Sequence, residues 1–219
     1  IFFEPRHAPM TFRRLSDSEA ELYQPPTPTF FLESWTLFKF VEPYYIDINF
    51  RFLAHQHVFE GGYIGLFWAS YINAPLDKSI YFQSDNSHWA QLCTQRHNDE
   101  STVCHVGDDM QLTFNHDYGD ALFRNFSPML YQLPLFYGLF DEHIWIVMFD
   151  RNEGIRITHS PSGGGTNSQY QTTNPAWDFQ FIIPDYQVNT KYGFNARMVY
   201  RPSCSREIIL NEYHRWING

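Results

Sequence analysis

The stretch that decides the fold is YIDINFRF, residues 45–52. Apolar side chains occupy every second position, and polar or tyrosine side chains occupy the positions between them. This period of two is typical of a strand with one face in a core. The alternation therefore predicts a half-buried strand whose polar face carries Asp47, Asn49 and Arg51.

Similar short runs recur along the chain, each bounded by turn residues. One segment alone has helical spacing: Ser205 can cap a helix that places Ile208, Ile209, Tyr213 and Trp216 on one face, against a sheet edge. Because strands follow one another without intervening helices, the sequence predicts an all-β fold. We expect an antiparallel sandwich, of supersandwich or jelly-roll type, with one short C-terminal helix. The other expected strands are 35–41, 63–69, 79–83, 89–94, 110–114, 138–140, 144–149, 154–158, 177–183 and 194–200.

The length of 219 residues suits one sandwich domain, residues 1–219. Charged residues make up only 18% of the chain and hydrophobic residues 43%, which excludes disorder and coiled coil. The chain opens at Ile1 without a methionine, so we expect either a removed presequence or a fragment of a longer chain.

The charge balance excludes two classes of partner. Fifteen Lys and Arg stand against 24 Asp and Glu, a net charge of −9, and no basic run could neutralise a phosphate backbone or an anionic membrane. No apolar stretch approaches the ~20 residues that span a bilayer, which predicts a soluble protein. The three cysteines allow one disulfide at most. Compartment and oligomeric state stay open.

Aromatic residues are unusually frequent, with 21 Phe, 14 Tyr and 6 Trp, or 19% of the chain. Aromatic side chains favour strands and also provide flat faces on which sugar rings stack. The composition therefore supports both a β fold and a carbohydrate ligand.

A first polar cluster holds His55, His57 and Glu60, next to a glycine pair. The two histidines are two residues apart, so in a continued strand both lie on one face. The set is similar to the metal motif of cupins, which implies a divalent metal. It departs from that motif in its spacing and lacks a second cupin motif. The alternative is a pair of hydrogen-bonded or solvent-facing histidines without a cofactor.

A second cluster, QRHNDE at residues 95–100, follows a predicted strand. Loops after strands often carry function. Here Arg96 could bind a carboxylate or a hydroxyl pair, and His97 or Glu100 could exchange protons in acid/base catalysis. A solvated loop is the alternative.

A third cluster joins Arg156 to His159 and the glycine loop that follows. Glycines allow close approach of a ligand to the backbone. The loop lacks the lysine ending of a phosphate loop, and neither Ser160 nor Ser162 stands in the G-x-S-x-G elbow, so nucleophilic serine catalysis is not expected.

The last candidate is the strand that begins at Trp177 and Asp178. These two side chains point to opposite faces, so a core position for Trp177 would leave Asp178 and Gln180 facing solvent or a cleft. A carboxylate flanked by aromatics can bind a sugar, and it is also a common surface arrangement.

Four segments, FWASYINAP (67–75), TQRHN (94–98), HSPSGGG (159–165) and NPAWDF (174–179), resemble a group of uncharacterised proteins from environmental bacteria. That resemblance implies no activity. In architecture the strand-rich, aromatic pattern is also similar to the galactose mutarotase-like superfamily. This similarity implies sugar handling by histidine and carboxylate groups on a concave sheet, although a fold does not fix a function.

Three functions remain open at this point. The first is a carbohydrate-active protein, a hydrolase, lyase or epimerase, with His97, His159 and Glu100 as catalytic residues. In it Arg96, Arg156, Trp177 and Asp178 bind a sugar or oligosaccharide, and no cofactor is expected. The second is a non-catalytic module that binds a glycan or another partner. The third is a cupin-like metalloenzyme.

Overall fold

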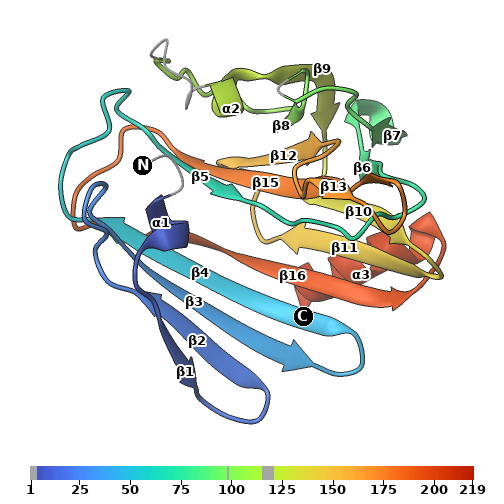
Figure 1. Cartoon of the computed structure of the whole chain (residues 1–219), viewed down its shortest axis with the longest axis horizontal. Coiled ribbons are helices and arrows are strands. Elements are labelled where there is room, and N and C mark those ends of the chain that lie inside the picture. Colours follow the sequence, from blue (N-terminus) through green and yellow to red (C-terminus); the bar gives the residue numbers. More distant parts are fainter. Residues whose placement is uncertain (1–3, 98, 115–120) are drawn as a thin grey trace.

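The computed structural model of the chain describes residues 4–97, 99–114 and 121–219, and consists mainly of strands (Figure 1). Two large sheets face each other, and a helix follows the last strand. The predicted all-β sandwich with a C-terminal helix is confirmed. Its helical elements are α1 (Glu4–His7), α2 (Ala121–Arg124), α3 (Arg206–Asn218) and the 3-10 turn η1 (Asp85–Ser87). Its strands are β1 (Thr11–Arg14), β2 (Glu19–Gln24), β3 (Leu32–Val41), β4 (Tyr45–Ala54), β5 (Ile64–Trp68), β6 (Ile80–Gln83), β7 (Trp89–Leu92), β8 (Thr102–His105), β9 (Phe126–Tyr131), β10 (Leu135–Phe140), β11 (His143–Phe149), β12 (Ile155–Ser160), β13 (Thr166–Asn167), β14 (Thr172–Thr173), β15 (Ala176–Ile183) and β16 (Tyr192–Pro202).

The larger sheet has nine strands in the order β1-β2-β3-β4-β16-β11-β10-β6-β7. All its neighbouring strands are antiparallel. Its first four strands form a meander, and β16 joins that meander to β11. A strand from the end of the sequence therefore holds the two parts of this sheet together.

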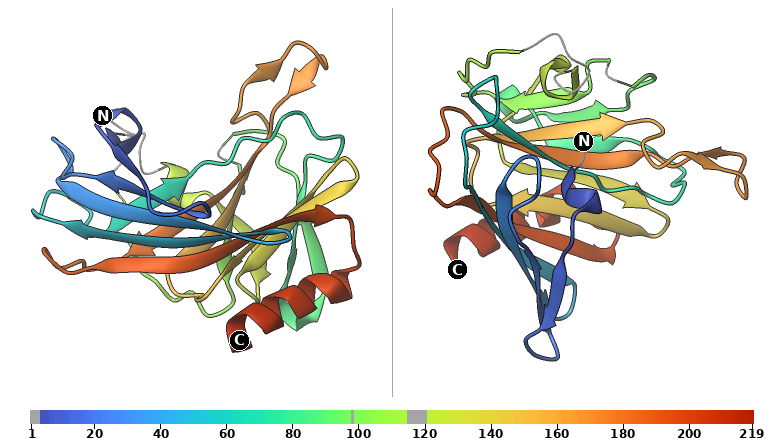
Figure 2. Two further views of the ribbon diagram at one scale, coloured as in Figure 1. Left: turned by 90° about the horizontal axis from the view of Figure 1, so that it is seen from below. Right: turned by 60° about the vertical axis from the view of Figure 1, so that its left-hand side comes forward.

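The smaller sheet has five strands in the order β5-β15-β12-β8-β9. Its neighbours are antiparallel except for β8 and β9, which run parallel. Residues 110–114 and 122–123 lie over the outer face of this sheet, where Phe123 packs on Tyr63 and Ile182. The small hairpin of β13 and β14 projects from the body of the molecule (Figure 2).

The main core lies between the two sheets and is made largely of aromatic rings. In β4 the predicted alternation is confirmed, since Ile48 and Phe52 are 2% and 1% exposed while Asp47, Asn49 and Arg51 lie half-buried on the other face. The Phe52 ring meets Phe181 of the facing sheet edge-on, at 6.2 Å between ring centres. Each such ring stabilises the fold by about 1.5 to 3 kcal/mol through burial. Much of the aromatic content therefore serves the core.

The C-terminal helix α3 begins as the sequence predicts, because the Ser205 hydroxyl accepts a hydrogen bond from the Ile208 N–H at 3.4 Å. The helix lies on the outer face of the nine-stranded sheet, not against a sheet edge (Figure 2). Ile209 and Tyr213 enter a second apolar cluster with side chains of β10, β11 and β16. Glu212 ties the helix to the sheet, since it accepts hydrogen bonds from Tyr45 Oη at 3.0 Å and Arg201 Nη1 at 2.5 Å.

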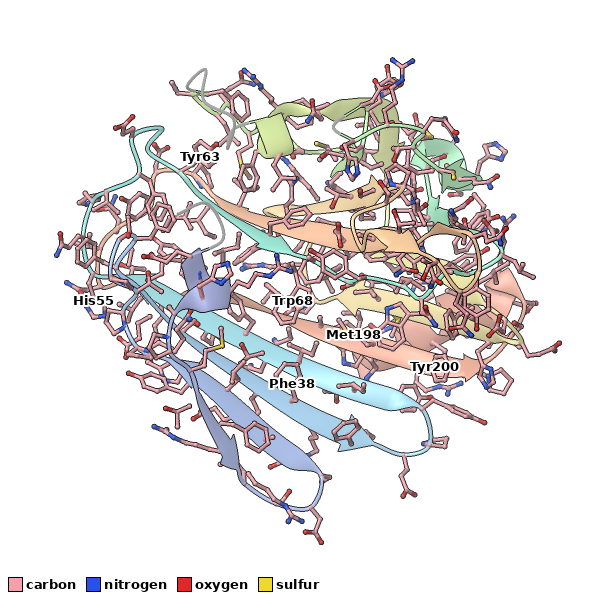
Figure 3. All side chains as sticks on the ribbon, viewed as in Figure 1. Phe38, His55, Tyr63, Trp68, Met198 and Tyr200 are labelled. Atoms are coloured by element: carbon pink, nitrogen blue, oxygen red, sulfur yellow. The ribbon has the colours of Figure 1, made fainter. Side chains whose placement is uncertain are left out.

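Two sequence expectations need correction. Residues 110–114 form no strand, and their apolar side chains pack as part of the cover over the five-stranded sheet. Asp178 and Gln180 face neither solvent nor an open cleft, since they are 2% and 0% exposed. In β16, Tyr200 lies on the same strand face as Met198, although Tyr200 is 43% exposed and stacks on His143 (Figure 3).

Other elements were not predicted. The strands β1, β2, β8, β9, β13 and β14 are short or lack a clear period of two. All three cysteines are free thiols. Among the helices of the described residues, none combines the length and apolar character needed to cross a bilayer.

Candidate functional site

A groove of 380 Å³ opens on the outer face of the nine-stranded sheet, beside the C-terminal end of α3. Its floor comes from neighbouring strands, with Leu37 on β3, Asn49 on β4 and Asn195 on β16. Asp150, directly after β11, and Trp216 of α3 form its sides. The volume lies in the range that small-molecule sites occupy.

Hydrogen bonds fix the polar side chains of this groove. The Asn195 side chain donates from Nδ2 to Asp150 Oδ2 at 2.6 Å and accepts at Oδ1 from Asn49 Nδ2 at 2.6 Å. Arg51 Nη2 donates to the same Asn195 oxygen at 3.1 Å. The Asn195 backbone N–H donates to Asp150 Oδ1 at 3.0 Å. The network holds two amides and a carboxylate in one orientation each.

Two charged side chains that line the groove are in ion pairs. Arg197 binds Asp47 through two hydrogen bonds of 2.5 and 2.8 Å, and Lys39 pairs with Glu19 at 3.0 Å. The Arg197 guanidinium also lies over the rings of Tyr45 and Trp216, 4.8 and 5.8 Å from their centres. The groove thus combines an aromatic side with a polar floor that includes the Asp150 carboxylate.

The predicted catalytic residue His97 lies elsewhere, at the end of the five-stranded sheet. Its Nε2 is 2.6 Å from Ser162 Oγ and its Nδ1 is 3.0 Å from Ser160 Oγ. Arg96 and Glu100 belong to the same loop and are exposed. Asn98 of that loop lies outside the described residues.

The other predicted catalytic residue, His159, is 2% exposed in the core. Its Nδ1 accepts a hydrogen bond from the Thr94 N–H at 3.2 Å, and its Nε2 lies 2.8 Å from the Lys78 carbonyl oxygen, to which it donates. Burial lowers the pKa of this imidazole and so favours its neutral form. Trp177 is 0% exposed and donates from Nε1 to the same carbonyl at 2.8 Å. In this structure both side chains connect core elements and do not reach the surface.

Arg156 and Asp178 lie in a buried polar layer on the outer face of the five-stranded sheet. Arg156 Nε donates to Asp108 Oδ2 at 2.9 Å. Burial alone would raise the pKa of the Asp108 carboxyl, but the hydrogen bond and charge of Arg156 outweigh burial and hold that pKa below its usual range. Asp178 Oδ1 accepts from the Ser70 N–H at 2.6 Å, and burial raises the pKa of its carboxyl to about 8. Among the residues that the structure describes, four atoms of the layer find no hydrogen-bond partner: Thr102 Oγ1, Arg156 Nη1, Thr158 Oγ1 and Gln180 Oε1.

The predicted metal ligands are not assembled into one site. His55, at the end of β4 in Figure 3, has its Nε2 2.7 Å from Glu33 Oε2, and the His57 ring lies 5.0 Å from that of Tyr186. Over the described ranges, no three His, Cys, Asp or Glu side chains come together as metal ligands.

Sequence reasoning missed three groove residues, Asp150, Asn195 and Trp216. One signal was available: Asn195 and Arg197 alternate with the apolar positions of β16, just as Asp47 and Asn49 do in β4. The polar faces of β4 and β16 lie side by side because these two strands pair. Nothing in the sequence showed that pairing.

No family model matches the chain, and no curated protein matches its sequence. Among solved structures the chain is similar to a putative aldose 1-epimerase from Escherichia coli K12, with a TM-score of 0.45, 6% identity, and coverage of 89% of this chain and 69% of that one. It is also similar to the protein HI1317, with a TM-score of 0.43, 8% identity, and coverage of 87% and 63%. The chain thus spans less than two thirds of the second protein. At these identities only the residues of this chain can support a function.

Proposed function

We propose that the chain binds a neutral carbohydrate in the groove on the outer face of the nine-stranded sheet. One observation carries the proposal: the side chains of Asn49, Asp150 and Asn195 are held by mutual hydrogen bonds next to the Trp216 indole. A sugar offers the complementary surface, with hydroxyl groups at its edge and C–H groups on its face.

Acceptor positions that the network does not use suit the hydroxyl groups of a sugar. The Asn49 side-chain carbonyl accepts no hydrogen bond from the described residues, so it can accept one from a ligand. A carboxylate has about four acceptor positions, and Asp150 uses only two of them on Asn195. Because these groups are already oriented, a ligand would spend little free energy on ordering them.

Hydroxyl groups of a neutral ligand suit the charges that line the groove. Asp47 is paired with Arg197 and Lys39 with Glu19, while the Asp150 carboxylate, held by the neutral N–H groups of Asn195, keeps acceptor positions for hydroxyl donors. A bound sugar would stack on Trp216 and hydrogen-bond to the floor.

Isothermal titration against a panel of neutral mono- and oligosaccharides tests the proposal. We expect binding by the unchanged protein, and at least a tenfold loss, about 1.4 kcal/mol, in both Asn195→Ala and Trp216→Ala. Phe12→Ala is the matched control, since this ring is 68% exposed on the edge strand β1 and should leave affinity unchanged.

Product analysis of the same sugars separates binding from turnover. A bound sugar recovered unchanged supports a binding module, whereas conversion that disappears in Asn195→Ala supports an enzyme that uses this groove. Binding that survives both groove substitutions, or no binding to any sugar, contradicts the proposal.

A further inference from the structure

A second site, independent of the groove, lies where His97 meets two serines. His97 Nε2 stands 2.6 Å from Ser162 Oγ, and its Nδ1 stands 3.0 Å from Ser160 Oγ. A nucleophile and its base in catalysis are separated by about 2.6 to 3.2 Å, and a third group orients the base. Although Ser162 lacks the G-x-S-x-G context on which the sequence expectation is based, we propose that it is a nucleophile for the hydrolysis of small carboxylic esters, with His97 as its general base and Ser160 as a positioning residue.

The loop that carries Ser162 is tied down on both sides. Gly164 N–H donates to the Asn174 carbonyl at 3.1 Å, and Asn174 N–H donates to the Gly165 carbonyl at 2.9 Å. The Thr173 hydroxyl donates to the Pro161 carbonyl at 2.8 Å. At Gly163 a β-carbon would come within 2.7 Å of the Ala176 side chain, so glycine allows the loop to lie directly on β15. These contacts hold Ser162 in place.

The loop that carries His97 is anchored through His159. The Thr94 N–H and hydroxyl both meet His159 Nδ1, at 3.2 and 2.8 Å, three residues before His97. His159 itself is fixed by the Lys78 carbonyl. The buried histidine therefore positions the segment that brings the exposed histidine to Ser162.

One tautomer of His97 suits this assignment. If Nδ1–H of His97 donates to Ser160 Oγ, Nε2 is left as an acceptor for the Ser162 hydroxyl. Ser162 Oγ then attacks the ester carbonyl carbon while its proton passes to Nε2. Collapse of the adduct breaks the bond to the alkoxide, which leaves as the alcohol with that proton. Water, deprotonated by the same nitrogen, then attacks the acyl-serine; the acyl–Oγ bond breaks, Ser162 Oγ takes the proton back from Nε2, and the carboxylic acid is released.

Two backbone groups can stabilise the negative charge of the adduct. Within the described residues, the N–H groups of Ser162 and Gly163 donate to no acceptor. Adjacent backbone N–H groups beside a nucleophile are a common source of such stabilisation. His97 is exposed and Ser162 half-buried, so the pair is accessible to a small ester from solvent.

A fluorophosphonate probe, with the labelled residue located by peptide mass spectrometry, tests the assignment. We expect the adduct on Ser162 in the folded protein and not in heat-unfolded protein. Ser162→Ala should abolish the adduct because it removes the attacking oxygen, and His97→Ala should lower labelling about 100-fold, the scale of lost acid/base assistance. Ser168→Ala is the matched control, an exposed serine six residues further along, and should be labelled like the unchanged protein.

Hydrolysis of p-nitrophenyl acetate tests the role of Ser160. Ser160→Ala should lower kcat with KM unchanged, and Ser160→Thr, which keeps the hydroxyl, should restore most of kcat. Labelling that persists in Ser162→Ala, an adduct on another residue, or a folded protein labelled no faster than the unfolded one would overturn the proposal. Each of these results is independent of sugar binding in the groove.

Discussion

The indole of Trp177 lies directly over Gly138, so that a β-carbon at position 138 would overlap the six-membered ring. Gly138 belongs to β10 of the larger sheet, and Trp177 crosses the core from β15 of the smaller one. The ring is held in that position by its hydrogen bond to the Lys78 carbonyl, 2.8 Å long.

Gly138→Ala should therefore destabilise the protein. The added methyl group forces either the ring or β10 to move in a close-packed core, which costs about 1 to 3 kcal/mol. Urea unfolding monitored by tryptophan fluorescence measures the loss. Gly107→Ala is the control, because its β-carbon would meet only the His105 ring, at 3.2 Å, and should change stability little. Equal stability of both variants would show that the core has room at Gly138.

Asp178→Asn should stabilise the protein at neutral and alkaline pH. The pKa of this carboxyl is raised from 3.8 to about 8 by burial, so the folded protein holds it neutral while the unfolded chain ionises it. The stability that it contributes is complete below pH 4 and is lost as pH rises through 8. Asparagine stays neutral and can still accept from the Ser70 N–H. The gain should be near zero at pH 4 and on the order of 4 kcal/mol at pH 8.

The free energy of unfolding of the unchanged protein and of Asp178→Asn, measured from pH 4 to pH 8, checks the prediction. Asp185→Asn, at an exposed position, supplies the control for removal of a charge. A gain for Asp178→Asn that does not change with pH would contradict a neutral carboxyl.

His159 should give the opposite pH dependence. Its pKa is lowered by burial, so its contribution to stability is present above the ordinary imidazole pKa of 6.5 and is lost as pH falls through the lower pKa of the folded protein. His159→Ala removes the bonds to Thr94 and Lys78 and leaves a cavity, which should cost roughly 2 to 4 kcal/mol at pH 8. The difference from the unchanged protein should shrink toward pH 5. If the difference in the free energy of unfolding does not change with pH, protonation of His159 costs the folded protein no stability.

Asp108→Asn should destabilise the protein by about 3 to 5 kcal/mol, because it leaves the buried Arg156 guanidinium without a counter-charge. Asp109→Asn is the matched control: it is the next residue, exposed, and should change stability by less than about 0.5 kcal/mol. Thermal unfolding at pH 7 compares them. A small effect of Asp108→Asn would mean that water reaches Arg156.

Local patterns predicted those parts of the fold that local interactions determine. The alternation of residues 45–52 specified both faces of β4, and the Ser205 cap located the start of α3. The same alternation in Met110, Leu112 and Phe114 marked residues that pack inward, but these residues have no neighbouring strand to pair with and cover a sheet face instead.

The candidate sites depend on contacts between distant parts of the chain. Asn49 meets Asn195 across 146 positions, and His97 meets Ser162 across 65. Gln180 donates a hydrogen bond to the Leu122 carbonyl across 58 positions, at 2.7 Å. No period in the sequence encodes these contacts, since they follow from the order in which strands pair.

The position of β16 also affects how the protein can be synthesised. The meander β1–β4 and the β10–β11 hairpin are translated before β16, the strand that lies between them in the sheet and ends at Pro202. Until then each part has an unpaired edge facing the space that β16 will fill, and exposed strand edges promote aggregation. The nine-stranded sheet can therefore close only after β16 has been translated. A premature stop before residue 192 would leave two partial sheets whose edge strands are unpaired. Such chains would depend on chaperones to avoid aggregation.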